Sequence, residues 1–221
     1  MLRGLFVTGT DTGVGKTVTC AALLCRCRQA VPVRYWKPIQ TGIEQDDDTE
    51  EVRRLASCFD EEIFSEGIRL QRPVSPHLAA QWSSLKIELD SLTGMVGSQT
   101  GSARWIVEGA GGALVPINDA QLMTDLMFAL GLPVVVVARS SLGTINHTLL
   151  TIEALRARDL YVAGVIMVGE KNSDNRAAIE RYGGVSVVGE MPLWKSLDSQ
   201  TLAEWAGREL DPRGCLLERL Q

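Results

Sequence analysis

The 221-residue chain has only two histidines and five cysteines, and this scarcity excludes several kinds of protein. The cysteines are odd in number and irregularly spaced, so neither a zinc site nor a disulfide framework fits them. We therefore expect reduced, mostly buried thiols in a cytoplasmic protein. The chain has no run of about 18 uncharged apolar residues, which excludes a transmembrane helix. No signal-peptide core precedes the first strand-like segment at Leu5.

The chain also has little net charge, only −5, while apolar residues make up 45% of it. This balance excludes a disordered chain and disfavours general nucleic-acid binding. At roughly 150 residues per domain, the length allows one large domain or two small ones. No repeat or linker divides the chain, so we predict a single domain over residues 1–221.

Short β-branched runs alternate with helical patterns along most of the chain. This alternation predicts an α/β fold with a mostly parallel central sheet and helices on both faces. The region from Glu44 to roughly Thr100 is less regular, and we expect helices and loops there, at one end of the sheet. The expected strands lie at Leu5–Thr8, Val33–Trp36, Trp105–Val107, Val134–Ala138, Val162–Val168 and Val185–Val188. The expected helices cover Thr17–Arg28, Leu122–Leu130 and Ile145–Leu155.

The strongest motif, Gly9-Thr10-Asp11-Thr12-Gly13-Val14-Gly15-Lys16-Thr17, follows a strand and opens a helix. Its glycines let successive backbone N–H groups face an anion, and the helix N-terminus adds its positive end. Lys16 can reach the phosphates of a nucleotide, and the Thr17 hydroxyl can hold Mg²⁺. Five residues, not the usual four, separate Gly9 from Gly15, which indicates a variant phosphate loop.

Further polar residues follow two other expected strands. Lys37 and Thr41 come after the second strand, and Glu108 comes after the third. Because ligands bind beyond the carboxyl ends of parallel strands, we expect these side chains beside the phosphate loop. Lys37 could stabilise an anionic transition state and Glu108 could hold Mg²⁺, although Lys37 alone also fits a solvent-facing lysine before a turn proline.

Besides the phosphate loop, the chain has five further motifs: Lys37-Pro38 through Gly42, Ser75-Pro76-His77, Val107-Glu108-Gly109-Ala110-Gly111-Gly112, Leu142-Gly143-Thr144-Ile145-Asn146-His147 and Gly189-Glu190-Met191-Pro192. In these motifs, and in their order and spacing from residue 5 to about residue 195, the chain resembles the dethiobiotin synthases. The resemblance implies a phosphate-loop NTPase fold and a cyclo-ligase of biotin biosynthesis.

The implied reaction joins 7,8-diaminopelargonate and CO₂ into dethiobiotin, with ATP as co-substrate and Mg²⁺ as cofactor. One amine traps CO₂ as a carbamate, which attacks the γ-phosphate. The other amine then closes the ring on the mixed anhydride. The family is cytoplasmic and homodimeric, with active sites shared between subunits, and has no nucleic-acid or membrane partner.

The resemblance also implies a role for individual residues. Lys16 and Lys37 are the expected catalytic residues. Thr17, Asp48 and Glu108 are the expected Mg²⁺ ligands, with Asp46 and Asp47 left as alternatives to Asp48. The expected nucleotide-binding residues are Thr12, Gly13, Val14, Gly15, Lys16, Thr17, Glu108, Gly109, Ala110, Gly111, Pro192, Leu193 and Trp194. The expected substrate-binding residues are Thr41, Ser75, Gly111, Gly112, Gly143, Thr144, Ile145 and Asn146, of which Gly143–Asn146 come from the partner subunit.

Three positions depart from the family pattern. Gly13 stands where the family often has glutamate, and Thr41 stands where it often has serine. Val168 replaces the asparagine that reads the adenine edge in the family, so base recognition must come from backbone groups or be weaker.

Two other functions remain open from the sequence. One is a partitioning or regulatory ATPase switch, which the absence of an extra lysine near the start of the phosphate loop argues against. The other is a catalytically inactive nucleotide sensor, which the intact Lys16, Thr17, Lys37 and Glu108 argue against.

Overall fold

A parallel sheet forms the centre of the computed structural model, which describes residues 2–97, 99 and 101–220. Among these residues the sheet has seven strands in the order β4-β2-β6-β1-β7-β8-β9, and every pairing is parallel. The strands are β1 (Gly4–Gly9), β2 (Val33–Trp36), β3 (Ile39–Thr41), β4 (Ile63–Phe64), β5 (Ile68–Leu70), β6 (Arg104–Gly112), β7 (Val134–Arg139), β8 (Val162–Val168) and β9 (Val187–Met191).

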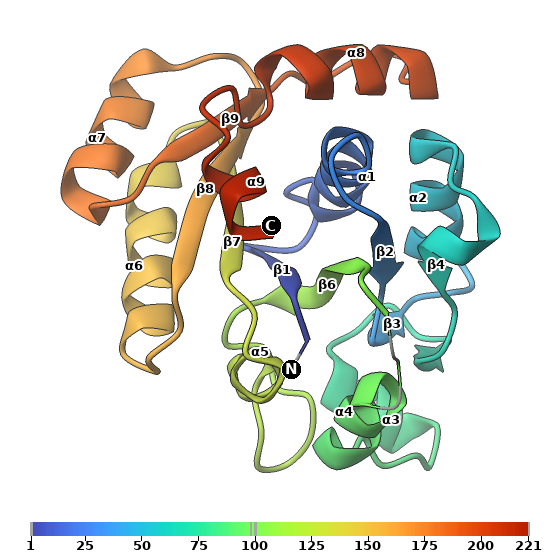
Figure 1. The fold of residues 1–221 in the computed structure, drawn as a ribbon. Coiled ribbons are helices and arrows are strands. Elements are labelled where there is room, and N and C mark those ends of the chain that lie inside the picture. Colours follow the sequence, from blue (N-terminus) through green and yellow to red (C-terminus); the bar gives the residue numbers. More distant parts are fainter. Residues whose placement is uncertain (1, 98, 100, 221) are drawn as a thin grey trace.

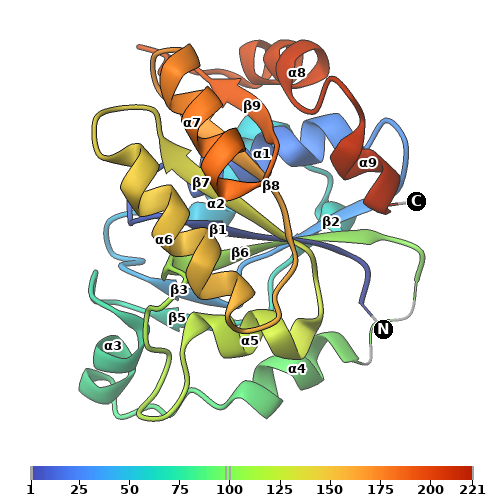
Figure 2. The same ribbon diagram turned by 90° about the vertical axis from the view of Figure 1, so that its left-hand side faces the viewer.

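Helices cover both faces of this sheet (Figure 1). One apolar core joins α1, α2, α8 and α9 to one face, and a second core joins α3 to α7 to the other. Figure 2 shows α6 and α7 side by side on the second face. The helices are α1 (Lys16–Cys27), α2 (Asp48–Ala56), α3 (Pro76–Trp82), α4 (Leu89–Gly97), α5 (Met123–Leu130), α6 (Thr144–Arg156), α7 (Ser173–Gly183), α8 (Ser199–Glu209) and α9 (Cys215–Leu220), with a 3₁₀ turn at Asp60–Glu62.

The central strands are buried on both faces, as their unbroken apolar sequences predict. In β1, Leu5 and Val7 enter the core beneath α1, whereas Phe6 enters the opposite core. The predicted α/β class, the parallel sheet and the two helical layers are therefore confirmed. No helix in the described ranges is long and apolar enough to cross a membrane.

Two of the expected strands have clearly different bounds in the structure. Strand β6 continues through Glu108 to Gly112, because it follows β1 as far as the pairing of Gly9 with Gly112. The last strand lies slightly later than expected, at Val187–Met191, because its pairing with β8 extends to Met191.

The irregular region contributes β4 to the main sheet, and β3 pairs with β5 in a separate two-stranded sheet within the described ranges. These strands have only two or three residues each, too few for a periodic pattern. Helices α2, α3 and α4 also lie in this region, as expected. Residues 98 and 100, at its end, lie outside the described ranges.

Candidate functional site

The phosphate loop joins the end of β1 to the start of α1. Gly13 and Gly15 have φ angles of 67° and 99°, a region of backbone conformation that favours glycine. A side chain at Gly9 would meet the Asp11 carbonyl oxygen at 2.8 Å, so the turn also requires a glycine there. The Lys16 ammonium bends back over the loop and donates to the Asp11 carbonyl oxygen at 3.1 Å. This is the geometry of an anion cradle at a helix N-terminus.

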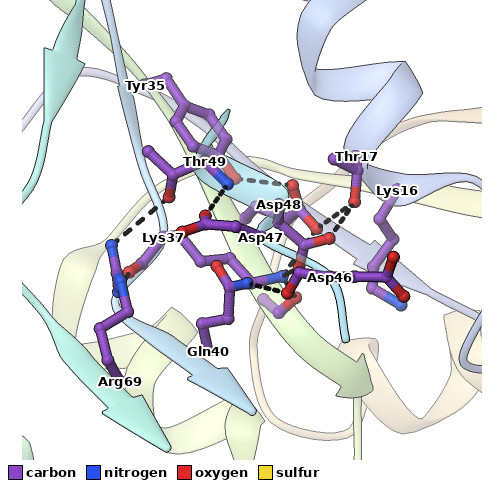
Figure 3. A network of polar contacts seen from close by, with 12 residues as sticks. Lys16, Thr17, Tyr35, Lys37, Gln40, Asp46, Asp47, Asp48, Thr49 and Arg69 are labelled. Carbon is purple, nitrogen blue, oxygen red and sulfur yellow. Dashed lines mark hydrogen bonds and ion pairs between the residues drawn. The ribbon is translucent and has the colours of Figure 1, made fainter. Parts of the chain in front are cut away.

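A cluster of charged and polar side chains from four elements lies next to this loop. The Thr17 hydroxyl donates to Asp48 Oδ1 at 2.8 Å and lies 3.0 Å from Glu108 Oε1. The Lys37 ammonium lies 2.6 Å from Asp48 Oδ2 and 2.7 Å from Glu108 Oε1. Figure 3 shows Thr17 from α1, Asp48 from α2 and Lys37 from the turn after β2 converging on one point.

Burial makes the charges of this cluster strongly dependent on one another. Glu108 is fully buried, and Lys37 is only 3% exposed. Burial alone lowers the pKa of Lys37, but Glu108 and Asp48 outweigh burial and raise it. Burial alone raises the pKa of Asp48, but Lys37 and the Thr17 hydroxyl outweigh burial and lower it. Lys37 and Asp48 therefore hold each other in the charged form.

Lys16 is in a different electrostatic environment. Burial lowers its pKa, and the positive charge of Lys37 lowers it further. Its hydrogen-bond partner is a neutral carbonyl rather than a carboxylate. Within the part of the chain that the structure describes, no carboxylate pairs directly with the buried Lys16 ammonium, which makes this end of the site attractive to an anion.

The structure separates the three consecutive aspartates that the sequence left as alternatives. Asp47 caps α2, because its carboxylate accepts the backbone N–H groups of Thr49 and Glu50. The side chain of Asp46 is exposed, and its backbone carbonyl accepts the Gln40 amide at 2.8 Å. Only Asp48 reaches Thr17 and Lys37.

Three residues that sequence reasoning missed support this cluster. The Tyr35 hydroxyl donates to Glu108 Oε2 at 2.9 Å, and burial together with Glu108 raises the pKa of this phenol. The Arg69 guanidinium donates to the Lys37 carbonyl oxygen at 2.9 Å, and the side-chain amide of Gln40 donates to the Asp46 carbonyl oxygen at 2.8 Å. Figure 3 shows Tyr35, Gln40 and Arg69 around the turn that carries Lys37. Tyr35 could have been suspected from β2, where the alternation places it on the face of α1.

A cavity of about 640 Å³ opens beside the loop and the cluster. Many of the residues predicted for nucleotide, substrate or metal line it: Thr12, Gly13, Gly15, Lys16, Thr17, Lys37, Thr41, Asp48, Ser75, Glu108, Ala110 and Gly111. The other predicted residues do not line it within this chain: Val14, Gly109, Gly112, Gly143, Thr144, Ile145, Asn146, Pro192, Leu193 and Trp194.

The Gly143–Asn146 turn begins α6, where Gly143 has a φ of 94°. Leu142, just before it, is fully exposed. This turn does not line the cavity of its own chain.

Gly13 and Val168, two of the positions that depart from the family pattern, lie near the phosphate loop. At Gly13 the Arg139 guanidinium lies beside the loop and donates to the Thr12 carbonyl oxygen at 3.2 Å. At the end of β8, the apolar side chain of Val168 lies against Gly15, where an added Cβ would be 3.4 Å from a Val168 methyl group.

A phosphate loop at the carboxyl edge of a parallel sheet, with a carboxylate and lysine cluster beside it, defines a phosphate-loop α/β protein. Solved structures agree on the fold. A ParA family ATPase from Chlorobium tepidum matches with a TM-score of 0.58 at 10% identity, over 100% of this chain and 98% of that one. MinD from Pyrococcus horikoshii in complex with Mg-ADP matches with a TM-score of 0.58 at 15% identity, over 100% and 94%.

Sequence comparison shows which family of phosphate-loop proteins this chain belongs to. A family model described as an AAA domain matches residues 3–201. The ATP-dependent dethiobiotin synthetase of Paramagnetospirillum magneticum is 48% identical over 91% of this chain and 94% of that protein. The Brucella melitensis enzyme of the same name is 44% identical over 90% of each chain. A biotin biosynthesis bifunctional protein from Bordetella avium is 48% identical over 92% of this chain and 42% of that protein. The chain belongs to the dethiobiotin synthetase family.

Proposed function

We propose that this chain is an ATP-dependent cyclo-ligase that forms dethiobiotin from 7,8-diaminopelargonate and CO₂, releasing ADP and phosphate. The observation that carries the proposal is the convergence of Lys16, Thr17, Lys37, Asp48 and Glu108 on one cavity in a member of this family. An anion cradle beside the Lys37 ammonium supports the proposal, because the reaction brings together two anionic groups, the carbamate and the γ-phosphate.

The phosphate loop is the proposed binding site for the ATP phosphates. The backbone N–H groups of residues 12–17 surround the anion, and Lys16 neutralises its β- and γ-oxygens. Lys16 suits this role because its ammonium is buried and donates to a carbonyl oxygen rather than to a carboxylate. Base recognition falls to the ends of β8 and β9, where Val168 offers no hydrogen bond, so we propose weak discrimination among nucleotide bases.

The donor set formed by Thr17, Asp48 and Glu108 fits Mg²⁺. All three contribute oxygen, and Mg²⁺ is usually held by one or two carboxylates together with substrate phosphates. When bound there, Mg²⁺ would neutralise the charge on the phosphate oxygens. Lys37 currently balances both carboxylates, so a second cation at this point frees its ammonium to face the substrate.

The proposed reaction has two bond-forming steps after carbamate formation. An amine of the diamine adds to CO₂ and loses a proton, and the carbamate oxygen attacks the γ-phosphorus as the bond to ADP breaks. The second amine attacks the carbonyl carbon, closes the ring, loses a proton and expels phosphate. Lys16 and Lys37 stabilise the anionic oxygens, and the cavity walls hold the reactants in line.

Other lining residues are proposed to hold the diamine. The proposed contacts are the hydroxyls of Thr41 and Ser75 and the backbone at Gly111, which line the cavity. The backbone of Gly112, the next residue in β6, is proposed to join them. The Gly143–Asn146 turn of a second copy is proposed to bind the far carboxylate through its free N–H groups. This assignment makes the protein a homodimer with shared sites. The free cysteines fit the reducing conditions of the cytoplasm, where we propose that the protein acts.

The test measures the release of the nucleoside diphosphate from ATP, CTP and GTP with Mg²⁺ and bicarbonate, with and without 7,8-diaminopelargonate. We expect release that depends on the diamine, a product with the mass of dethiobiotin, and similar rates with the three nucleotides. Release that ignores the diamine would instead indicate an ATPase switch. Nucleotide binding without turnover, measured by calorimetry, would indicate a nucleotide sensor.

A further inference from the structure

The two oxygens of the Glu108 carboxylate have different partners. Oε1 lies 2.7 Å from the Lys37 ammonium and 3.0 Å from the Thr17 hydroxyl. Oε2 accepts the Tyr35 hydroxyl at 2.9 Å. Tyr35 and Glu108 are both fully buried, so no solvent competes for these contacts. The carboxylate is thereby held in one orientation, with one oxygen toward the site and the other toward the core.

The sheet itself produces this arrangement. Tyr35 of β2 pairs with Ile106 of β6, and Glu108 lies two residues further along the same strand. Tyr35 and Ile106 both enter the core beneath α1, so Glu108 points to that face as well. The phenol ring therefore stands beside the carboxylate and reaches its far oxygen, while Thr17 and Lys37 reach the near one.

A carboxylate can bind a cation through one oxygen or through both. A hydrogen bond that occupies Oε2 leaves only Oε1 to face Thr17 and Asp48. We propose that Tyr35 is a positioning residue that fixes Glu108 as a one-oxygen ligand of the Mg²⁺ site. The inference rests on the proposed function only in taking Mg²⁺ as the cation, and Tyr35 itself touches neither the metal nor the substrate.

The test replaces Tyr35 by phenylalanine, which keeps the ring and removes the hydroxyl. Manganese binding to the full-length chain in the presence of ADP is measured by electron paramagnetic resonance, with Mn²⁺ as the probe. We expect the affinity for Mn²⁺ to fall about tenfold, the scale found for residues that orient metal ligands. ADP binding without metal should stay within about twofold of wild type, because the phosphate loop is intact.

Tyr161→Phe is the matched control. The Tyr161 hydroxyl also takes part in a hydrogen bond, which it accepts from the Arg219 guanidinium, but Tyr161 lies just before β8, at the amino end of that strand. This control should bind Mn²⁺ like the wild type. If Tyr35→Phe also binds Mn²⁺ like the wild type, the proposal is overturned, and the phenol serves only to satisfy a buried acceptor.

A second pair of variants covers the case in which Tyr35→Phe does not fold. In a Glu108→Ala background the carboxylate is gone, so adding Tyr35→Phe should leave Mn²⁺ affinity unchanged. A further loss in the double variant would overturn the proposal, because Tyr35 would then act other than through Glu108. The proposed function fails separately: a wild-type chain that forms no dethiobiotin leaves the manganese result intact.

Discussion

Two buried lysines flank the same cavity, and they differ in what balances their charge. Lys16 donates to a neutral carbonyl of the phosphate loop. Lys37 lies within 2.7 Å of both an aspartate and a glutamate oxygen. Burial and Lys37 lower the pKa of Lys16, whereas the two carboxylates outweigh burial and raise the pKa of Lys37. The charge of Lys16 is thus not balanced by a contacting carboxylate among the described residues, whereas two carboxylates balance the charge of Lys37.

This difference indicates the order in which the two lysines serve a ligand. A phosphate stabilises a buried ammonium most when no carboxylate already contacts that ammonium. Lys16 therefore contributes to the binding of the nucleotide. Lys37 can contribute only after its carboxylates have acquired another positive charge. Lys37 is therefore suited to the chemical step rather than to capture of the nucleotide.

The largest expected effect is that of Lys37→Gln on turnover. Removing the ammonium should lower kcat by at least about a hundredfold, the scale of losing one contact to a charged transition state. Nucleotide affinity should change little, because Lys16 and the loop remain. Steady-state kinetics and calorimetry together measure the two quantities. Lys86→Gln, which removes an exposed lysine paired with Glu88, is the control, and near-normal turnover in Lys37→Gln would contradict the assigned role.

Lys16→Gln should lower the nucleotide affinity, which Lys37→Gln should leave almost unchanged. Nucleotide affinity should fall by about tenfold to a hundredfold, as expected for one charge-assisted hydrogen bond. The free energy of unfolding of the ligand-free protein should hold or rise, because an unpaired buried charge is removed. Lys37→Gln should instead destabilise the ligand-free protein by about 3 kcal/mol, since two carboxylates lose their partner. Equal loss of stability in the two variants would remove the distinction between the lysines.

The sequence predicted the Lys16 side of this comparison better than the Lys37 side. A phosphate loop is local: a strand, a glycine-rich turn and a helix follow one another, so the residues themselves specify the geometry. The same is true of the long central strands and of α5, which ends at Leu130 as predicted, with Gly131 as its C-terminal cap at a φ of 65°. Local patterns were sufficient wherever one segment determines its own conformation.

The Lys37 side depends on contacts between residues far apart in the chain. Asp46, Asp47 and Asp48 cannot be distinguished by composition, and only the docking of α2 against α1 brings Asp48 to Thr17. Tyr35 and Arg69 carry no motif, and their partners are set by the register of β2 with β6 and of β3 with β5. The short strands near Arg69 were missed for the same reason, since their pairing is tertiary.

Thr17→Val should have a smaller effect than either lysine substitution. The variant keeps the shape of the side chain but loses the hydroxyl that contacts Asp48 and Glu108. Affinity for Mg²⁺ at a fixed nucleotide concentration should fall by roughly fivefold to tenfold, the value of one net hydrogen bond. Calorimetric titration with Mg²⁺ measures it. Thr93→Val removes a hydroxyl bonded within α4 and should leave the titration unchanged; unchanged Mg²⁺ affinity in Thr17→Val would refute the assignment.

The smallest expected effect is on the pH dependence of stability. Lys37 lowers the pKa of Asp48 in the folded protein, so the unfolded chain takes up a proton at this residue more readily. The contribution of Asp48 is complete above the ordinary aspartate pKa of about 3.9 and is lost as the pH falls through the lowered folded value. Asp48→Asn should therefore flatten the acid limb of the unfolding free energy measured with urea. Asp60→Asn, at an aspartate whose side chain is 93% exposed, should leave that limb as steep as in the wild type. If Asp48→Asn and Asp60→Asn have the same acid limb, the pair between Asp48 and Lys37 does not hold the carboxylate in its charged form.

The raised pKa of Lys37 predicts a matching change at alkaline pH. The stability that the charged Lys37 contributes is present below the ordinary lysine pKa and is lost only as the pH rises through the raised pKa of the folded protein.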